Sequence, residues 1–238
     1  MAAKRIGVKE VSPFTAIGIE GNAGQGKSRL ISEFLHLSQH FYIYGATSNI
    51  HSRSYHIFVS LIKRSIKITE LDSLDVIKQK LNDFYFDVQS YLTEKESQEF
   101  VESKVLIGFL IGIKSDDERL KTKGRELQTH FQIAIRRFIH ALTLKANLSG
   151  IPLVIILEDL HWIDDPSKDA LINLFESFGI ARENENSPEY LFIFNYRPEF
   201  EMPIEINRNC NFEEIKLQPL KEPECLEIMD YFTDKNEL

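Results

Sequence analysis

The expected fold follows from one eight-residue stretch, Gly21-Asn22-Ala23-Gly24-Gln25-Gly26-Lys27-Ser28. This is the complete G-x-x-x-x-G-K-S pattern, which arises by chance roughly 0.004 times in a chain of this composition. The apolar run before it, Phe14 to Glu20, is β-prone, and the residues after it, up to Ser38, carry apolar side chains at helical spacing. A Gly-rich turn without function is the alternative interpretation. The order strand, loop, helix is the context that the pattern requires, so we predict nucleotide binding.

Each residue type in this stretch has a part in binding phosphate. Glycines let the backbone wrap closely, so that successive N–H groups point at the β-phosphate. The helix that opens at Lys27 adds the positive end of its dipole. Lys27 is expected to reach the β- and γ-phosphate oxygens, and the Ser28 hydroxyl to bind Mg²⁺. No guanine-reading Asn-Lys-x-Asp motif occurs, which disfavours a GTPase.

A second polar feature follows a buried strand. Leu153 to Leu157 is a continuous apolar run, the pattern of a central parallel strand, and it ends in Glu158 and Asp159. Ligands bind at the carboxyl ends of the strands in open α/β sheets. One of the two carboxylates is expected to hold Mg²⁺ and the other to orient or deprotonate an attacking water. A solvated acidic strand end or a helix cap is the alternative.

The next predicted strand, Tyr190 to Phe194, leads to Asn195 and Arg197. A guanidinium beside the acidic strand can reach the γ-phosphate and sense it, or stabilise charge during its transfer. The alternative is a surface arginine paired with Glu199. We favour the first interpretation because Arg197 precedes Pro198 at a sheet edge where ligands gather.

The residues just after the acidic pair are expected to have structural roles. Asp164 and Asp165 are expected to cap the helix that begins near Pro166, since a carboxylate there satisfies free N–H groups. His161 and Trp162 are expected to pack, because a lone histidine has no visible set of metal ligands.

Strands that alternate with helices along the chain predict a parallel α/β sheet. Phe41 to Tyr44 reads as a second strand, a long helix is signalled from Arg125, and residues 56–113 between them are mainly helical. The longest apolar run, Val105 to Ile113, reads as a buried element whose two glycines lie at close contacts; a helix on a membrane surface is the alternative. We therefore expect a P-loop NTPase three-layer sandwich with a central, mainly parallel sheet and an inserted helical stretch.

Composition and charge exclude several classes of protein. There are 28 basic and 36 acidic residues, a net charge of −8, so general nucleic-acid binding is disfavoured. Cys210 and Cys225 are too few for a disulfide scaffold and lack zinc-ligand spacing. The longest apolar run is well short of the ~20 residues of a membrane span, and no secretory signal is visible after Met1. We expect a cytoplasmic protein.

Three segments, taken in order, resemble one family of ATPases. They are GNAGQGKSRL at 21–30, ALTLKANLSGIPLVIILEDLHWIDDPS at 141–167 and FIFNYRPEF at 192–200. They look like the ATPase module of the STAND class of signalling NTPases, which are close relatives of AAA ATPases. The nearest branch is the one found in soluble adenylyl cyclases and large LuxR-type transcriptional regulators. In that branch the phosphate loop is followed by Arg-Leu, as Arg29 and Leu30 are here, so the resemblance adds Arg29 to the cofactor-binding residues.

The resemblance also implies roles for the acidic pair and for partners. Glu158 occupies the position where related strands carry the metal-binding Asp, so we place Glu158 on Mg²⁺ with Ser28, and Asp159 as the base. Arg197 completes the expected catalytic set. The family's modules hydrolyse ATP slowly and switch larger proteins, which implies other domains as partners and a nucleotide-dependent oligomer.

The resemblance sets the expected domain boundaries. Residues 1–216 are the expected ATPase core, and 217–238 the beginning of a helical lid that is truncated, as in a fragment of a larger protein. The Gly-Arg-Glu box that family members carry ahead of the first strand is not recognisable in residues 1–13. Two other functions remain open at this point: a stand-alone P-loop kinase for a small molecule, and a scaffold that binds nucleotide without catalysis.

Overall fold

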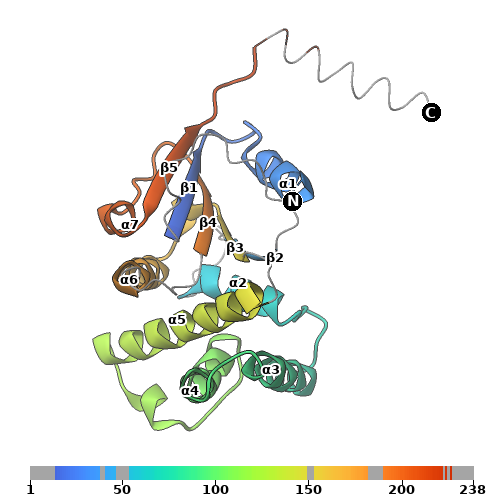
Figure 1. The fold of residues 1–238 in the computed structure, drawn as a ribbon, viewed down its shortest axis with the longest axis vertical. Coiled ribbons are helices and arrows are strands. Elements are labelled where there is room, and N and C mark those ends of the chain that lie inside the picture. The colour runs from blue at the N-terminus through green and yellow to red at the C-terminus, as the bar shows by residue number, and fades with distance from the viewer. Residues whose placement is uncertain are drawn as a thin grey trace, which may run out of the picture.

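The computed structural model describes residues 14–37, 41–46, 54–148, 153–181 and 190–221, with residues 223 and 226. At its centre is a sheet of five parallel strands in the order β2-β3-β4-β1-β5 (Figure 1). The strands are β1 (Phe14–Glu20), β2 (Phe41–Ala46), β3 (Leu153–Glu158), β4 (Tyr190–Tyr196) and β5 (Asn211–Lys216). The expected α/β class and parallel sheet are confirmed. β5 was not foreseen, because its sequence, NFEEIK, has one aliphatic residue and four exposed positions.

Helices cover both faces of the sheet. On one face α1 (Lys27–Leu37) packs through Ile31 against Ile19, Val154 and Ile193. On the other face lies a larger apolar core. Its helices are α2 (His56–Ser65), α5 (Arg125–Leu148), α6 (Asp165–Ala181) and α7 (Ile204–Asn209). Figure 1 shows α1 on one side of the sheet and α6 and α7 on the other. None of the described helices is long and apolar enough to cross a membrane.

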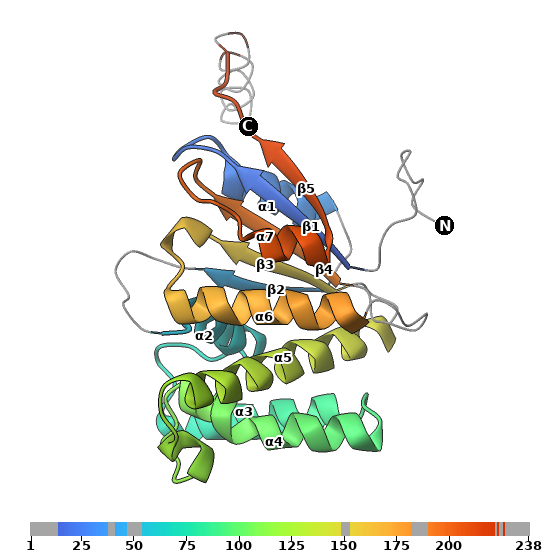
Figure 2. The same ribbon diagram turned by 90° about the vertical axis from the view of Figure 1, so that its left-hand side faces the viewer.

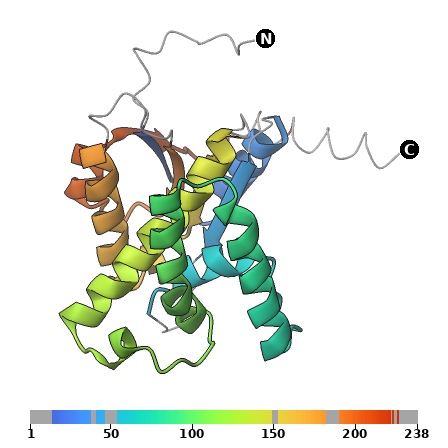
Figure 3. The same cartoon turned by 60° about the horizontal axis from the view of Figure 1, so that its bottom comes forward.

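The inserted helical stretch resolves into α2, α3 (Leu74–Gln89) and α4 (Glu94–Leu110). α3 and α4 pack on the side of α5 away from the sheet (Figures 2 and 3). Tyr85 stacks on Phe100 with ring centroids 4.1 Å apart, and its hydroxyl lies 2.9 Å from Ser103 Oγ. Thr93 and Glu96 form a capping box that starts α4, as the sequence Thr-x-x-Glu favours.

The expectation for Val105 to Ile113 was half correct. Leu106, Ile107 and Ile111 are buried, but Phe109 is 43% exposed. Of the two glycines, only Gly108 is at a close contact, 3.3 Å from Leu81 Cδ2 to where a Cβ would lie. Gly112 has a φ of +104° and open space around it, so it ends the helix by backbone conformation.

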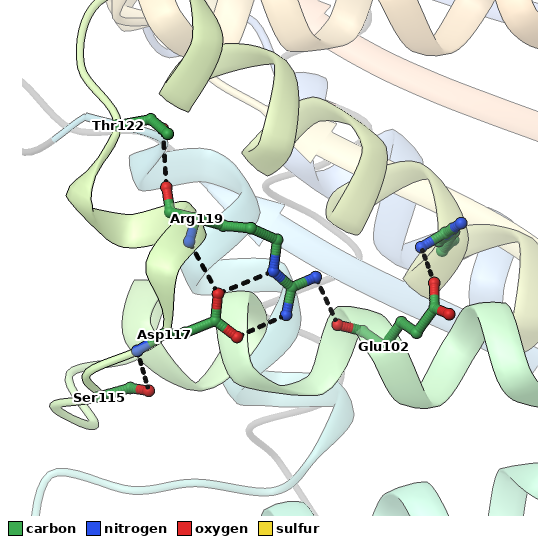
Figure 4. Close-up of polar contacts among 6 residues, drawn as sticks. Glu102, Ser115, Asp117, Arg119 and Thr122 are labelled. Carbon is green, nitrogen blue, oxygen red and sulfur yellow. Dashed lines mark hydrogen bonds and ion pairs between the residues drawn. The ribbon is translucent and has the colours of Figure 1, made fainter.

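The charged loop between α4 and α5 is held by one aspartate. Asp117 accepts hydrogen bonds from Arg119 Nε at 2.8 Å and Nη2 at 2.8 Å, and from its backbone N–H at 3.0 Å (Figure 4). These bonds lower the pKa of Asp117 to about 2. Arg119 also donates to the Glu102 carbonyl at 2.9 Å, which ties the short 3₁₀ helix η1 (Glu118–Lys121) back to α4.

Asp164 joins two helices that are distant in sequence. Its carboxylate accepts from the Ser167 N–H at 2.9 Å and so caps α6, as the sequence predicts. It also accepts from the N–H groups of Tyr55 at 2.9 Å and His56 at 3.1 Å, at the start of α2. Asp165 is the first residue of α6 and not its cap. The second contact depends on tertiary structure and has no local signal.

We expect Asp164→Ala to lower the free energy of unfolding by about 2–4 kcal/mol, because two helix starts lose their acceptor. Asp165→Ala is the matched control and should cost less than about 1 kcal/mol, since only a favourable charge near a helix dipole is removed. Urea unfolding of both variants measures the difference. Equal losses of unfolding free energy in the two variants would show that Asp164 stabilises the fold no more than the neighbouring Asp165 does.

Candidate functional site

The phosphate loop connects β1 to α1 at the carboxyl edge of the sheet. Gly24 and Gly26 have φ angles of +82° and +87°, a region that other residues adopt only with strain, and no atom lies within 4 Å of where their Cβ would be. The Gly21 N–H donates to the Tyr196 carbonyl at 3.2 Å, which ties the loop to the end of β4. The first N–H groups of α1 have no acceptor within the helix. Glycine is therefore required in this loop for conformation and for access to the backbone.

Lys27 is folded back over the loop. Its side chain is 9% exposed, and Nζ donates to the carbonyls of Gly21 at 2.7 Å and Asn22 at 2.8 Å. The Asn22 N–H in turn donates to the Gln25 side-chain oxygen. Burial lowers the pKa of Lys27, and the negative charge of Asp159 opposes this. The loop thus satisfies its own polar groups with bonds that phosphate oxygens can replace.

Glu158 lies across from the start of α1. It is 8% exposed and accepts a hydrogen bond from Asn195 Nδ2 at 2.9 Å. Burial raises the pKa of Glu158, while a hydrogen bond with the Ser28 hydroxyl opposes that rise. The two residues predicted to hold Mg²⁺ are therefore in direct contact, although they are far apart in sequence.

Asp159 follows at a strained backbone position. Its φ is +58°, in the left-handed region that few non-glycine residues occupy. Its N–H donates to Asn195 Oδ1 at 2.8 Å, so the Asn195 amide holds both the Glu158 carboxylate and the Asp159 backbone. This turns the chain sharply at the end of β3, where the short 3₁₀ helix η2 (Leu160–Trp162) begins.

Asn195 is the residue that sequence analysis left without a role. It is 1% exposed at the end of β4, between β1 and β3. A buried asparagine needs partners for its amide, and the carboxyl edge of a parallel sheet supplies them. The signal in the sequence was an amide in an otherwise apolar strand, YLFIFNY.

Among the described residues, Arg197 makes no hydrogen bond to the phosphate loop. Its guanidinium carbon lies 5.7 Å from the centroid of the Trp162 ring, and Nη1 lies 3.9 Å from Glu199 Oε1. The surface ion pair considered above is therefore present, but the aromatic contact was not expected. Trp162 is 44% exposed, and it lies against His161 and Arg197 rather than in the apolar core. The His161 ring nitrogens are both occluded and have no hydrogen-bond partner among the described residues.

A cavity of about 580 Å³ adjoins this edge of the sheet. Its lining includes Ser28 and Glu158, the apolar side chains of Ile31 and Ile43, and Arg64 from the end of α2. Arg29, the other expected binding residue, is exposed and pairs with Glu33 at 2.5 Å.

The residues of this site can bind a nucleoside triphosphate together with Mg²⁺. The loop offers backbone N–H groups and one ammonium to the phosphates, and Ser28 and Glu158 offer two oxygen ligands. No group of three or more His, Cys, Asp or Glu side chains is placed to hold a metal in the part of the chain that the structure describes. Mg²⁺ at phosphates needs only one or two protein ligands and keeps several waters, so the donor set fits this ion.

Fold and loop together define a P-loop nucleotide-binding protein with a parallel α/β sheet. Residues 7–184, about three quarters of the chain, match the AAA ATPase domain family. The chain therefore belongs to the AAA ATPase domain family and is an AAA-like nucleotide-binding module. ATPases of this family generally bind ATP with Mg²⁺. A comparison with curated proteins finds no matching relative.

The raised pKa of Glu158 has a consequence for stability. A buried acid whose pKa is raised in the folded state makes folding less favourable as pH rises from the unfolded value, 4.5, through the folded one. Glu158→Gln keeps an acceptor for Asn195 without the charge, so it should raise the melting temperature at pH 8 by about 2–4 °C. The gain should vanish near pH 4.5. Thermal unfolding from pH 4.5 to pH 8 measures it, with exposed Glu199→Gln as control; a variant less stable than the parent at pH 8 contradicts the expectation.

Proposed function

We propose that this protein is an ATP-binding regulatory module that hydrolyses ATP slowly, with Mg²⁺, and switches a larger assembly between states. The observation that carries the proposal is the arrangement around Asn195. Its amide holds Glu158 and the Asp159 backbone beside Ser28, at the edge of the sheet where the phosphate loop opens. A loop that binds phosphate and two adjacent acids are what phosphoryl transfer to water requires.

The phosphates take over the bonds that the empty loop makes within itself. Lys27 Nζ gives up the carbonyls of Gly21 and Asn22 and donates to phosphate oxygens instead. The Asn22 N–H likewise gives up the Gln25 side-chain oxygen for a phosphate oxygen. Burial lowers the pKa of Lys27, and anionic phosphate oxygens beside it act in the opposite direction, because they favour the charged ammonium. The remaining N–H groups of residues 21–28 complete the cradle.

Glu158 and Ser28 are proposed as the metal ligands. Bound Mg²⁺ supplies positive charge that draws electron density from the phosphates. Its charge also favours the ionised form of Glu158, which burial opposes. Asp159 is proposed as the residue that orients or deprotonates the attacking water, because its backbone is pinned by Asn195 and its charge acts on Lys27.

Arg197 is proposed to sense the γ-phosphate. It stands two residues after Asn195, and its positive charge lowers the pKa of Lys27, so the two cations share one region of the site. A flexible, 37% exposed side chain held by a long ion pair can move to a phosphate.

The regulatory role is supported by the resemblance to STAND-class modules of adenylyl cyclases and LuxR-type regulators. Glu158-Asp-Leu-His-Trp and Tyr196-Arg-Pro-Glu carry that resemblance. We propose residues 1–216 as the core and a lid from residue 217, most of which lies outside the described residues. ATP then controls how the lid and attached domains sit, and copies assemble through the nucleotide.

Mg-ATP in millimolar amounts should raise the melting temperature of the chain, because a ligand specific for the native state stabilises it by about 2.7 kcal/mol at 100 times its dissociation constant. Lys27→Ala should abolish the shift. Turnover should stay far below one per second for this chain alone. A turnover of several per second would contradict a slow switch, and no thermal shift with Mg-ATP would remove nucleotide binding altogether.

Substitution of Glu158 and Asp159 one at a time should distinguish their two roles. Glu158→Gln should weaken ATP binding in the presence of Mg²⁺ by about tenfold or more and leave Mg²⁺-free binding nearly unchanged. Asp159→Asn should keep Mg-ATP binding and lower turnover by 10²-fold or more. Isothermal titration with and without Mg²⁺, beside a single-turnover assay, measures both. The reverse pattern would exchange the two roles.

A further inference from the structure

The arginine proposed as the γ-phosphate sensor lies on the chain's single tryptophan. The Arg197 guanidinium is 5.7 Å from the Trp162 ring centroid, within the range of a cation–π contact. Trp162 is 44% exposed, a large apolar side chain that the core does not use. Burial in the core therefore does not explain a tryptophan at this position, and we consider its contact with Arg197.

The Trp162 backbone is held relative to the end of β4. Its backbone N–H donates to the Asp159 carbonyl at 2.9 Å, within the turn that Asn195 holds through the Asp159 N–H. Arg197 follows Asn195 by two residues, so the amide that positions the acids also sets the tryptophan opposite the arginine. The guanidinium and the indole meet because of the same turn.

The guanidinium is close to the phosphate region as well as to the ring. Its charge lowers the pKa of both Lys27 and His161, after the larger effect of burial on each. The His161 ring nitrogens beside it are occluded and without a partner among the described residues. Arg197 thus lies against an aromatic face and is near enough to Lys27 of the phosphate loop for its charge to act there.

We propose that Trp162 is a positioning residue, on whose ring Arg197 rests until the γ-phosphate of ATP draws the guanidinium away. The inference rests on the proposed function, since it needs ATP in the phosphate loop. ADP lacks the γ-phosphate and leaves Arg197 on the ring. Trp162 therefore lowers the affinity for ATP relative to that for ADP, and the position of Arg197 reports whether the γ-phosphate is present.

The direction follows from the strengths of the two contacts. A cation–π contact at an exposed site is weak, whereas a guanidinium makes bidentate, charge-assisted hydrogen bonds to phosphate. The Glu199 carboxylate, 62% exposed and 3.9 Å away, holds the arginine little. The guanidinium therefore leaves the ring for the phosphate. Because the cation–π contact is lost in that step, the indole reduces ATP affinity by roughly two- to fivefold.

Tryptophan fluorescence tests the movement directly, because the chain has one tryptophan. Binding of the Mg²⁺ complexes of a non-hydrolysable ATP analogue and of ADP is first measured by isothermal titration. The ATP analogue should change the Trp162 emission and ADP should not. Arg197→Gln should remove the change while the chain still binds nucleotide, and Glu199→Gln, the matched control, should leave it as in the parent.

Substitution of the ring tests the affinity. Trp162→Leu should raise the ratio of ATP-analogue to ADP affinity by roughly two- to fivefold, and Trp162→Phe, with a weaker π face, should fall between. A merely structural role would lower both affinities together. A falling ratio, or an emission change that persists in Arg197→Gln, overturns the proposal; absence of any calorimetric binding overturns the proposed function itself and the inference with it.

Discussion

The structure depends on the position of β4 between β1 and β3. All strands are parallel, so their carboxyl ends meet at one edge, and the phosphate loop after β1 and the acids after β3 flank the end of β4. The residue there, Asn195, has an amide that both donates and accepts. It bonds to the Glu158 carboxylate and to the Asp159 N–H, and the next residue, Tyr196, accepts a hydrogen bond from the Gly21 N–H, so the end of β4 is bonded to both halves of the site.

Burial disfavours the charged forms of two ionisable side chains in the site, and ligands of opposite charge favour those forms. Burial lowers the pKa of Lys27 and raises the pKa of Glu158, so each is driven toward its neutral form. Phosphate oxygens beside Lys27 and a cation beside Glu158 reverse both effects. The loop meanwhile satisfies its own donors with Gln25 and two carbonyls, which limits the cost of burying them until a ligand arrives.

The helical layer below the sheet is attached to the same turn region. Asp164 follows Asp159 by five residues and caps both α6 and α2, where the inserted helices begin. α5 then lies between the sheet layer and the pair α3 and α4 (Figure 2). A change at the end of β3 therefore has a direct covalent and hydrogen-bonded route to the start of the insert.

The amino-acid sequence alone predicted the class of fold, the phosphate loop and the strand that carries the acids. These features have local signals: glycines at fixed spacing, an apolar run in LVIIL, and helical periodicity from Arg125. It did not reveal β5, whose residues are mostly exposed, or the contacts of Asn195 and Trp162. Only the tertiary structure decided those, because strand order and the turn at Asp159 bring together side chains that are distant in the chain, and no spacing in a sequence records a contact between strands.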